Sequence, residues 1–247
     1  MNEQIYELNV AGRILRYRFR DPRAALWFTL PLTPGGQDSN VLEIDGDILE
    51  QGRKRLPAQV SDVALEYKLL LAPTARQLLR ERACIFHSVA FIWRGLAWLL
   101  SATSGVGKTT QFRRWRELYG EEVQIISGDM PILTLEADGR VQVNPSPWPG
   151  KERWYGNRSA PLGGVILLEQ AAENEIICLE PQESFNRMTG RIMCRPDTEE
   201  EIRCFAELFD AILANHPVWL LRNLGDPASA QLTEETLEAY LAERNKQ

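Results

Sequence analysis

The segment Ser101-Ala-Thr-Ser-Gly-Val-Gly-Lys-Thr-Thr110 decides the fold. It follows an apolar run at residues 96–100 and precedes a run with helical character at residues 111–118. The order strand, glycine-rich loop, helix is the context in which a phosphate-binding loop forms. The pattern G-x-x-x-x-G-K-[ST] is met except that Ala102 stands at the first glycine position. The alternative interpretation is a chance Gly-Lys-Thr turn between a strand and a helix.

Phosphate binding follows from the residue types in this segment. Gly105 and Gly107 lack a Cβ atom, so the backbone can approach an anion closely. Successive backbone N–H groups and the start of the next helix then face the phosphate oxygens. Lys108 is expected to reach the terminal phosphates and the Thr109 hydroxyl to ligate Mg²⁺. The sequence therefore predicts ATP or another nucleoside triphosphate with Mg²⁺, bound by these residues: Ser104, Gly105, Val106, Gly107, Lys108, Thr109 and Thr110.

Length and composition narrow the class of protein. The chain has 247 residues, enough for one large α/β domain or for a small and a medium one. Its net charge of −6 argues against nucleic acid and anionic lipid as partners. The first residues resemble no signal peptide and no apolar run is long enough to span a membrane, so we expect a cytoplasmic protein without a membrane partner. The four cysteines have no metal-ligand spacing and are expected to be free thiols, and a homo-oligomer is possible.

Residues 1–82 are predicted to form a β-rich region packed on a catalytic domain at 83–247. Strands at 5–10 and 13–19 flank the turn Ala11-Gly12, which is a hairpin signal. Residues 61–82 are expected to be mostly helical. The other elements expected before residue 61 are a strand at 25–30, a loop at 34–40 and a tight turn at 44–48. Whether this region only covers the nucleotide domain or also helps to select the acceptor stays open.

Strands and helices alternate in the predicted catalytic domain. His87 is placed inside a buried strand at 84–92, and Asp129 follows a strand at 122–126. A proline-punctuated loop at 145–152 carries Lys151 and Glu152. The remaining expected elements are a hairpin at 131–135 and 141–143, strands at 164–168, 175–179 and 217–222, helices at 181–193 and 198–215, and a last helix capped by Thr233.

Residues 83–225 resemble the HPr kinase/phosphorylase group and its phosphoenolpyruvate-carboxykinase-like P-loop relatives. The residues that carry this resemblance are His87-Ser-Val-Ala90, Ser104-Gly-Val-Gly-Lys-Thr109, Gly128-Asp129, Trp148-Pro-Gly-Lys-Glu152, Ala160-Pro-Leu162 and Pro217-Val-Trp-Leu-Leu221. The resemblance implies an α/β domain with a mixed, helix-flanked P-loop sheet rather than an all-parallel one. Gly128 stands where the group has the first acid of a pair, which argues against a reverse phosphorylase reaction. Residues 1–82 do not resemble the amino-terminal domain of HPr kinase itself.

Three residues outside the loop are candidates for catalysis. Asp129 is expected at the carboxyl end of a strand beside the loop, as a general base or Mg²⁺ ligand, or else as an ordinary turn aspartate. His87 either orients that base near the γ-phosphate or is a hydrogen-bonded histidine within the strand. Lys151 either stabilises the transferred phosphoryl group or is solvated.

Aromatic and arginine side chains near these residues have two interpretations. Trp148 and Trp154 either shape an acceptor pocket or cover the core. Arg187, Arg191 and Arg195 fall at helical spacing, and form either a solvated basic face or a contact to phosphate.

The sequence therefore predicts a Mg-nucleotide-dependent kinase. Its acceptor would be a hydroxyl group on a protein, a peptide or a small metabolite. A second hypothesis is a nucleotide-binding regulatory module with little or no turnover. A third is a carboxykinase-like enzyme, which the short chain makes less attractive.

Overall fold

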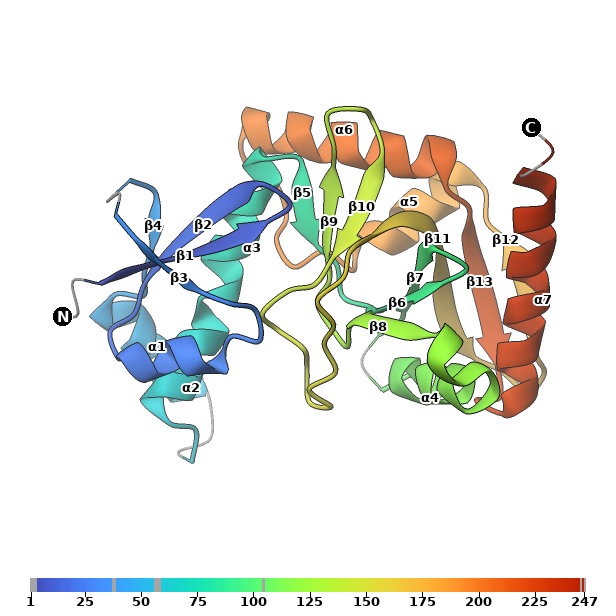
Figure 1. The fold of residues 1–247 in the computed structure, drawn as a ribbon, viewed down its shortest axis with the longest axis horizontal. Helices are drawn as coiled ribbons and strands as arrows, with labels where there is room; N and C mark the ends of the chain where they lie inside the picture. The colour runs from blue at the N-terminus through green and yellow to red at the C-terminus, as the bar shows by residue number, and fades with distance from the viewer. Residues whose placement is uncertain (1–3, 37–38, 56–58, 104, 245, 247) are drawn as a thin grey trace.

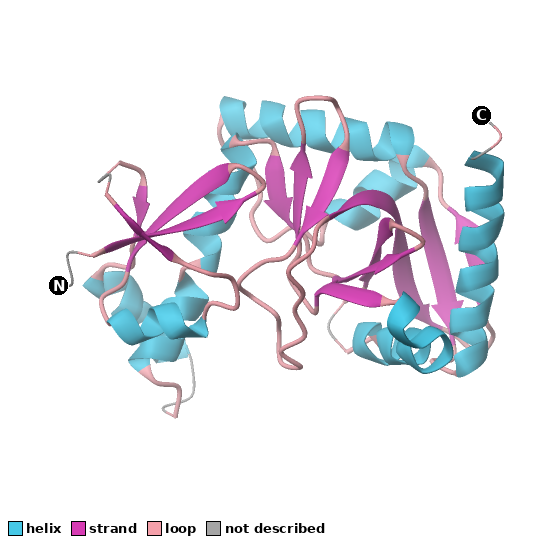
Figure 2. Ribbon diagram, viewed as in Figure 1, coloured by secondary structure: helices cyan, strands magenta, loops and turns pink. Residues whose placement is uncertain are grey.

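The computed structural model describes residues 4–36, 39–55, 59–103, 105–244 and 246. Within them the strands form a four-stranded sheet near the N-terminus and a nine-stranded sheet in the rest of the chain (Figure 1). Helices flank both sheets, so the predicted α/β class with a mixed sheet is confirmed (Figure 2).

The N-terminal sheet has the strand order β3-β1-β2-β4. Its strands are β1 (Ile5–Val10), β2 (Arg13–Arg18), β3 (Thr33–Gly35) and β4 (Val41–Leu42). β1 and β2 pair antiparallel across a turn in which Ala11 and Gly12 have φ of 50° and 82°. Positive φ at both central residues suits a two-residue hairpin turn. The predicted hairpin is therefore confirmed.

Two predictions for this region are wrong, and in both an aspartate starts a helix instead. Residues 22–27 form a 3₁₀ helix, η1 (Pro22–Trp27), in place of a strand; the Asp21 carboxylate accepts from the Arg23 backbone N–H. The expected turn at 44–48 opens α1 (Gly46–Arg55), where the Asp45 carboxylate accepts from the Ile48 N–H at 2.7 Å. Such acceptors satisfy the free N–H groups of a first helical turn.

The region before residue 83 is consequently mixed rather than predominantly β. The helices α2 (Asp62–Leu69) and α3 (Leu71–Arg80) confirm the helical prediction for residues 61–82. An aromatic core joins this region to the rest of the molecule: Phe28 lies 5.9 Å from Trp148, centroid to centroid. The domain boundary at residue 83 stays a prediction.

The large sheet places the glycine-rich loop at its centre. β7 (Leu96–Ser101) runs parallel to β11 (Ala160–Gln170), which runs parallel to β13 (Val218–Asn223). On its other side β7 pairs antiparallel with β6 (Val89–Trp93), which pairs antiparallel with β8 (Gln124–Ser127). β8 therefore points the same way as β7, so the carboxyl ends of β7, β8, β11 and β13 lie at one edge.

The other strands of this sheet are β5 (Ala83–Ile85), β9 (Ile132–Leu135), β10 (Val141–Asn144) and β12 (Glu175–Cys178). The helices are α4 (Lys108–Tyr119), α5 (Pro181–Thr189), α6 (Glu199–Asn215) and α7 (Pro227–Arg244), with a short 3₁₀ turn η2 (Gly120–Glu122). α6 contributes Leu208, Phe209 and Ile212 to one buried cluster of the sheet. α4 and α7 contribute Phe112, Trp115 and Leu237 to another, so the helices cover the sheet from two sides.

Three element boundaries differ from the sequence predictions. The strand expected at 84–92 is interrupted between β5 and β6, so His87 and Ser88 lie in the break. The helix expected at 181–193 ends at Thr189, before Gly190. Thr233 does not cap the last helix: it is buried inside α7, where its hydroxyl donates to the Ser229 carbonyl, and the helix begins at Pro227. The Thr198 cap of α6 is confirmed by its hydrogen bond from the Glu201 N–H.

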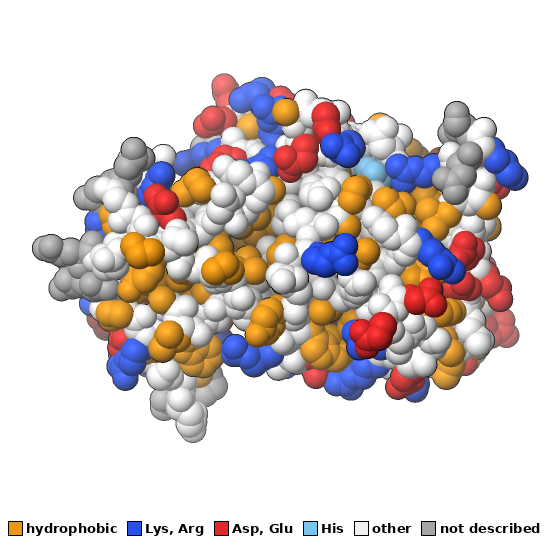
Figure 3. All heavy atoms as spheres, in the orientation of Figure 1, with side chains coloured by type: hydrophobic (Ala, Val, Ile, Leu, Met, Phe, Trp, Pro, Cys, Tyr) orange, Lys and Arg blue, Asp and Glu red, His pale blue; other side chains and the backbone are white. Residues whose placement is uncertain are grey.

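Two further observations concern the surface and the thiols. Hydrophobic side chains gather over the N-terminal half of the face in Figure 3, whereas acidic and basic ones are interspersed over the other half. The four cysteines are free, as predicted. Among the described residues, no helix combines the length and apolar character needed to cross a membrane.

Candidate functional site

The glycine-rich loop (residues 102–107) connects β7 to α4, which confirms the predicted order of strand, loop and helix. Gly105 and Gly107 have φ of 87° and 118°, a region that side chains with a Cβ atom rarely adopt. Gly107 precedes α4 and makes no side-chain cap, so the first-turn N–H groups lack that partner. Ser104 lies outside the described residues.

A cavity of about 350 Å³, here called the first cavity, opens beside this loop. It brings together most of the residues predicted from the sequence: His87, Gly105, Gly107, Lys108, Thr109, Thr110, Asp129 and Lys151. Gly128, Gly150 and Glu152 complete its lining. Val106 instead lines a second cavity of about 280 Å³, together with Thr103 and Arg191.

His87 stands between a cation and a carboxylate in the first cavity. Its Nε2 atom lies 3.1 Å from Lys108 Nζ and 3.2 Å from Asp129 Oδ1. An imidazole nitrogen either accepts through its lone pair or donates through its proton. Without a proton on Nε2, His87 can therefore accept from Lys108, and with a proton on Nε2 it can donate to Asp129, but Nε2 cannot do both at once.

The break between β5 and β6 holds His87 in this place. The His87 backbone N–H donates to the Arg191 carbonyl at 2.8 Å, and the Ser88 N–H donates to the Asp129 carbonyl at 2.9 Å. The Ser101 hydroxyl donates to the His87 carbonyl at 2.8 Å. These hydrogen bonds interrupt the regular strand pairing at residues 87–88. They connect this break to Ser101 at the end of β7 and to Asp129 after β8. Sequence reasoning missed Ser101, and a hydroxyl as the last residue of an otherwise apolar strand is the signal that could have found it.

Burial lowers the pKa of the Lys108 ammonium from its ordinary 10.5. The nearby Asp129 carboxylate raises this pKa in part, and the positive charge of Arg191 lowers it further. Removing a cation from water without full compensation is unfavourable, and an anion nearby relieves the cost. The loop thus presents a partly desolvated positive charge that a bound anion would stabilise.

The proline-rich loop (residues 145–159) covers Asp129 from the other side. A Cβ atom on Gly128 would lie 2.7 Å from the Pro149 carbonyl oxygen, and one on Gly150 would lie 2.6 Å from the Asp129 Cβ. Both positions therefore need glycine for the two segments to touch. This packing gives a physical reason for Gly128: any acidic side chain there would push the loop away from the cavity.

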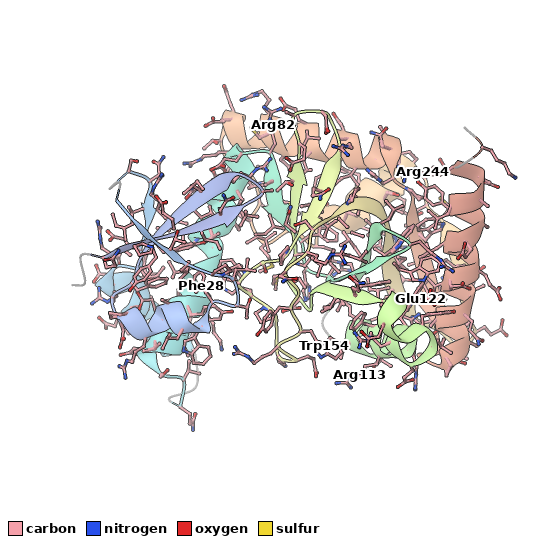
Figure 4. All side chains as sticks on the ribbon, in the orientation of Figure 1. Phe28, Arg82, Arg113, Glu122, Trp154 and Arg244 are labelled. Carbon is pink, nitrogen blue, oxygen red and sulfur yellow. The ribbon has the colours of Figure 1, made fainter. Side chains whose placement is uncertain are left out.

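Contacts from two distant regions fix the proline-rich loop. The Tyr67 hydroxyl donates to the Pro147 carbonyl at 2.6 Å, and the Trp148 indole N–H donates to the Tyr67 carbonyl at 3.3 Å. On the α4 side, Glu152 pairs with Arg113 at 2.9 Å, and Arg113 lies over the Trp154 ring (Figure 4). Neither tryptophan lines the first cavity: Trp148 is buried in one core cluster, and Trp154 is partly buried and packs against another. Lys151 is exposed and makes no hydrogen bond or ion pair with the described residues.

The three arginines expected at helical spacing do not share a helix face, because α5 ends at Thr189. Arg187 pairs with Glu169 at 2.5 Å and with Glu183 at 2.8 Å. Arg191 lies beyond the helix, and its buried Nε atom has no hydrogen-bond partner within the described residues. Arg195 is exposed. Of the three, Arg191 is the one whose charge acts on Lys108.

Comparison with known proteins adds little to this geometry. No family model and no curated protein matches the sequence. The solved structure of the HPr(Ser) kinase/phosphatase from Coxiella burnetii is similar with 11% identity and a TM-score of 0.37, covering 66% of this chain and 99% of that one. A similarity this weak carries no conclusion about activity.

Proposed function

We propose that the chain is a kinase that transfers the γ-phosphoryl group of a nucleoside triphosphate to a hydroxyl acceptor. This proposal rests on the contacts of the His87 imidazole beside the glycine-rich loop. Its Nε2 atom lies 3.1 Å from Lys108 Nζ and 3.2 Å from Asp129 Oδ1. A cation for phosphate, a carboxylate for a proton and an imidazole between them are the groups that such a transfer uses.

Phosphate binding is assigned to the glycine-rich loop and the first turn of α4. The described residues proposed to bind the nucleotide are Gly105, Val106, Gly107, Lys108, Thr109 and Thr110, and Ser104 is proposed with them from the sequence pattern alone. A bound phosphate would accept the hydrogen bond that Lys108 otherwise donates to His87. The imidazole would then be free to donate to Asp129 from a proton on Nε2.

Oxygen donors suit Mg²⁺, and the first cavity supplies them through the Thr109 hydroxyl and the Asp129 carboxylate. Bound there with the nucleotide, Mg²⁺ would neutralise charge on the phosphates. These two side chains are the proposed metal-binding residues of the chain.

In the proposed transfer, the Asp129 carboxylate accepts the proton of the acceptor hydroxyl. The acceptor oxygen bonds to the γ-phosphorus while the bond to the β–γ bridging oxygen breaks, and the diphosphate leaves with that electron pair. His87 orients Asp129, and Lys151 on the proline-rich loop stabilises the oxygens of the phosphoryl group in transit. The acceptor is a hydroxyl on a protein, a peptide or a small metabolite.

One observation favours the second candidate, a nucleotide-binding regulatory module. The other carboxylate of the first cavity, Glu152, is paired with Arg113, and Gly128 replaces an acid beside Asp129. Asp129 would then have to serve both metal and acceptor. If it serves the metal alone, the chain would bind nucleotide and release it unchanged.

Asp129→Asn separates the two candidates. A kinase predicts a loss of phosphate transfer of at least about 100-fold, as expected for removing a general base, with ATP binding retained. The measurement is label transfer from γ-labelled ATP to proteins and metabolites of the native cell, beside ATP binding by calorimetry. Asp138→Asn, at an exposed turn, is the matched control. Equal transfer by wild type and Asp129→Asn, or no labelled acceptor with either, would contradict the kinase.

A further inference from the structure

The second cavity adjoins the glycine-rich loop on the side away from Asp129. It is lined by Thr103 and Val106 of the loop, by residues 167–170 of β11, by Leu220 of β13, and by Arg187 and Arg191. In the sheet, β11 and β13 lie on one side of β7, whereas β6 and β8 lie on the other. Asp129 follows β8, so the loop separates the two cavities.

The chemistry of phosphoryl transfer requires this separation. The attacking oxygen and the leaving oxygen lie roughly in line on opposite sides of the transferred phosphorus. With the acceptor beside Asp129 in the first cavity, the rest of the nucleotide must leave the loop on the opposite side. From this geometry we infer that the second cavity binds the nucleoside half of the nucleotide, an inference that rests on the proposed kinase function.

The lining of the second cavity suits a flat aromatic base. Val106, Leu167 and Leu220 supply apolar surface, and Leu167 and Leu220 are buried. Glu169 and Gln170, at the carboxyl end of β11, supply polar groups at the rim. Its volume of about 280 Å³ is close to the lower end, roughly 300 Å³, for small-molecule sites.

Arg187 is held ready to stack on such a base. Its guanidinium pairs with Glu169 at 2.5 Å and with Glu183 at 2.8 Å, which fixes the plane of the group. A fixed guanidinium plane stacks on aromatic rings, which the point charge of a lysine does not reproduce.

Arg191 links the second cavity to the phosphates. Its side chain lines this cavity, and its charge is close enough to Lys108 to lower the pKa of that ammonium. Its buried Nε has no partner within the described part of the chain. A phosphate between the nucleoside and the loop would supply that partner.

The test compares Mg-ATP with Mg-tripolyphosphate, which has the phosphates and no nucleoside, by calorimetry. Base stacking predicts that wild type binds ATP at least about 10-fold more tightly than tripolyphosphate. Arg187→Lys keeps the positive charge beside Glu169 and Glu183 but removes the planar guanidinium. Most of the preference for ATP over tripolyphosphate should therefore disappear, while the affinity for tripolyphosphate stays within about 2-fold of wild type. Arg203→Lys, in a comparable exposed pair with Glu207, is the matched control.

Adenosine gives an independent readout. It should bind wild type together with tripolyphosphate, because the two occupy different cavities, and it should compete with ATP. Equal affinity of wild type for ATP and tripolyphosphate, or equal weakening of both by Arg187→Lys, would overturn the nucleoside assignment and leave the kinase proposal standing. Absence of binding to wild type by ATP as well as by tripolyphosphate would instead remove the kinase proposal, and this inference with it.

Discussion

The two loops that border the first cavity are built in different ways. The glycine-rich loop takes its shape from its sequence neighbours, since β7, two glycines of positive φ and the start of α4 lie within a few residues of one another. The proline-rich loop takes its shape from residues far away in the sequence, namely Tyr67, Gly128 and Arg113. Local patterns therefore predict the first loop in detail, whereas the second can be placed only once the fold is known.

Lys108→Ala tests the locally built loop and should have the largest effect. It removes the half-buried ammonium that is proposed to bind a phosphate, so we expect ATP affinity to fall about 100-fold, the equivalent of one or two charged hydrogen bonds. Calorimetric titration with Mg-ATP measures it. Lys54→Ala, which removes an exposed lysine paired with Glu50 on α1, should bind like wild type. Unchanged ATP affinity in Lys108→Ala would show that the loop does not hold the phosphates.

Gly128→Ala tests the contact between Gly128, beside Asp129, and the proline-rich loop. Its added Cβ would lie 2.7 Å from the Pro149 carbonyl and 3.0 Å from the Trp154 Cβ, so backbone must move. Overpacking of this kind costs about 1–3 kcal/mol in the free energy of unfolding, measured by urea denaturation. Gly190→Ala is the matched control because its Cβ would meet only the Arg187 carbonyl, at 3.8 Å. A variant as stable as wild type would mean that the proline-rich loop does not rest on Gly128.

Tyr67→Phe tests the long-range anchor of the proline-rich loop. It deletes the hydroxyl that donates to the Pro147 carbonyl at 2.6 Å, and the buried carbonyl loses its partner. We expect the free energy of unfolding to fall by about 1 kcal/mol and the melting temperature by roughly 2–4 °C, as measured by calorimetric unfolding. Tyr119→Phe, whose hydroxyl makes no hydrogen bond to the described residues, should melt with wild type. If both variants melt alike, Tyr67 is not an anchor.

The same contrast decides how much of the structure the sequence predicts. Strand, loop and helix around Lys108 follow from glycines, an apolar run and a helical run, and Thr198 and the first hairpin follow from local capping and turn chemistry. Asp21 and Asp45 are equally local signals, but β-type residues at 25–30 suggest a strand in place of η1, and Asp45-Gly46-Asp47 suggests a tight turn in place of the start of α1. Asp129 is predicted at the sheet edge from its position after a strand, and His87 is a candidate mainly through the family resemblance; both line the first cavity.

Other features of the site depend on contacts between distant segments. The break in the strand at His87 follows from hydrogen bonds to Arg191 and Asp129, which no local pattern encodes. Gly128 read as a missing acid in the sequence, and only the Pro149 carbonyl beside it explains the glycine. The nearness of Arg191 to Lys108 likewise depends on where the chain goes after α5.

The pH dependence of stability should show the smallest effect and sharpens the comparison at Lys108. Burial lowers the pKa of this ammonium in the folded protein below the ordinary 10.5, so the unfolded chain binds more protons between the two values. The free energy of unfolding should therefore rise with pH across that window, and below it the charged Lys108 makes the folded state less stable. Lys108→Met lacks this contribution, so the stability of wild type relative to Lys108→Met should increase in urea titrations as the pH rises toward 10.5. Saturating tripolyphosphate should flatten the rise, because a bound anion raises the same pKa. A difference that is constant with pH, or that falls, would mean that Lys108 is not desolvated in the folded protein.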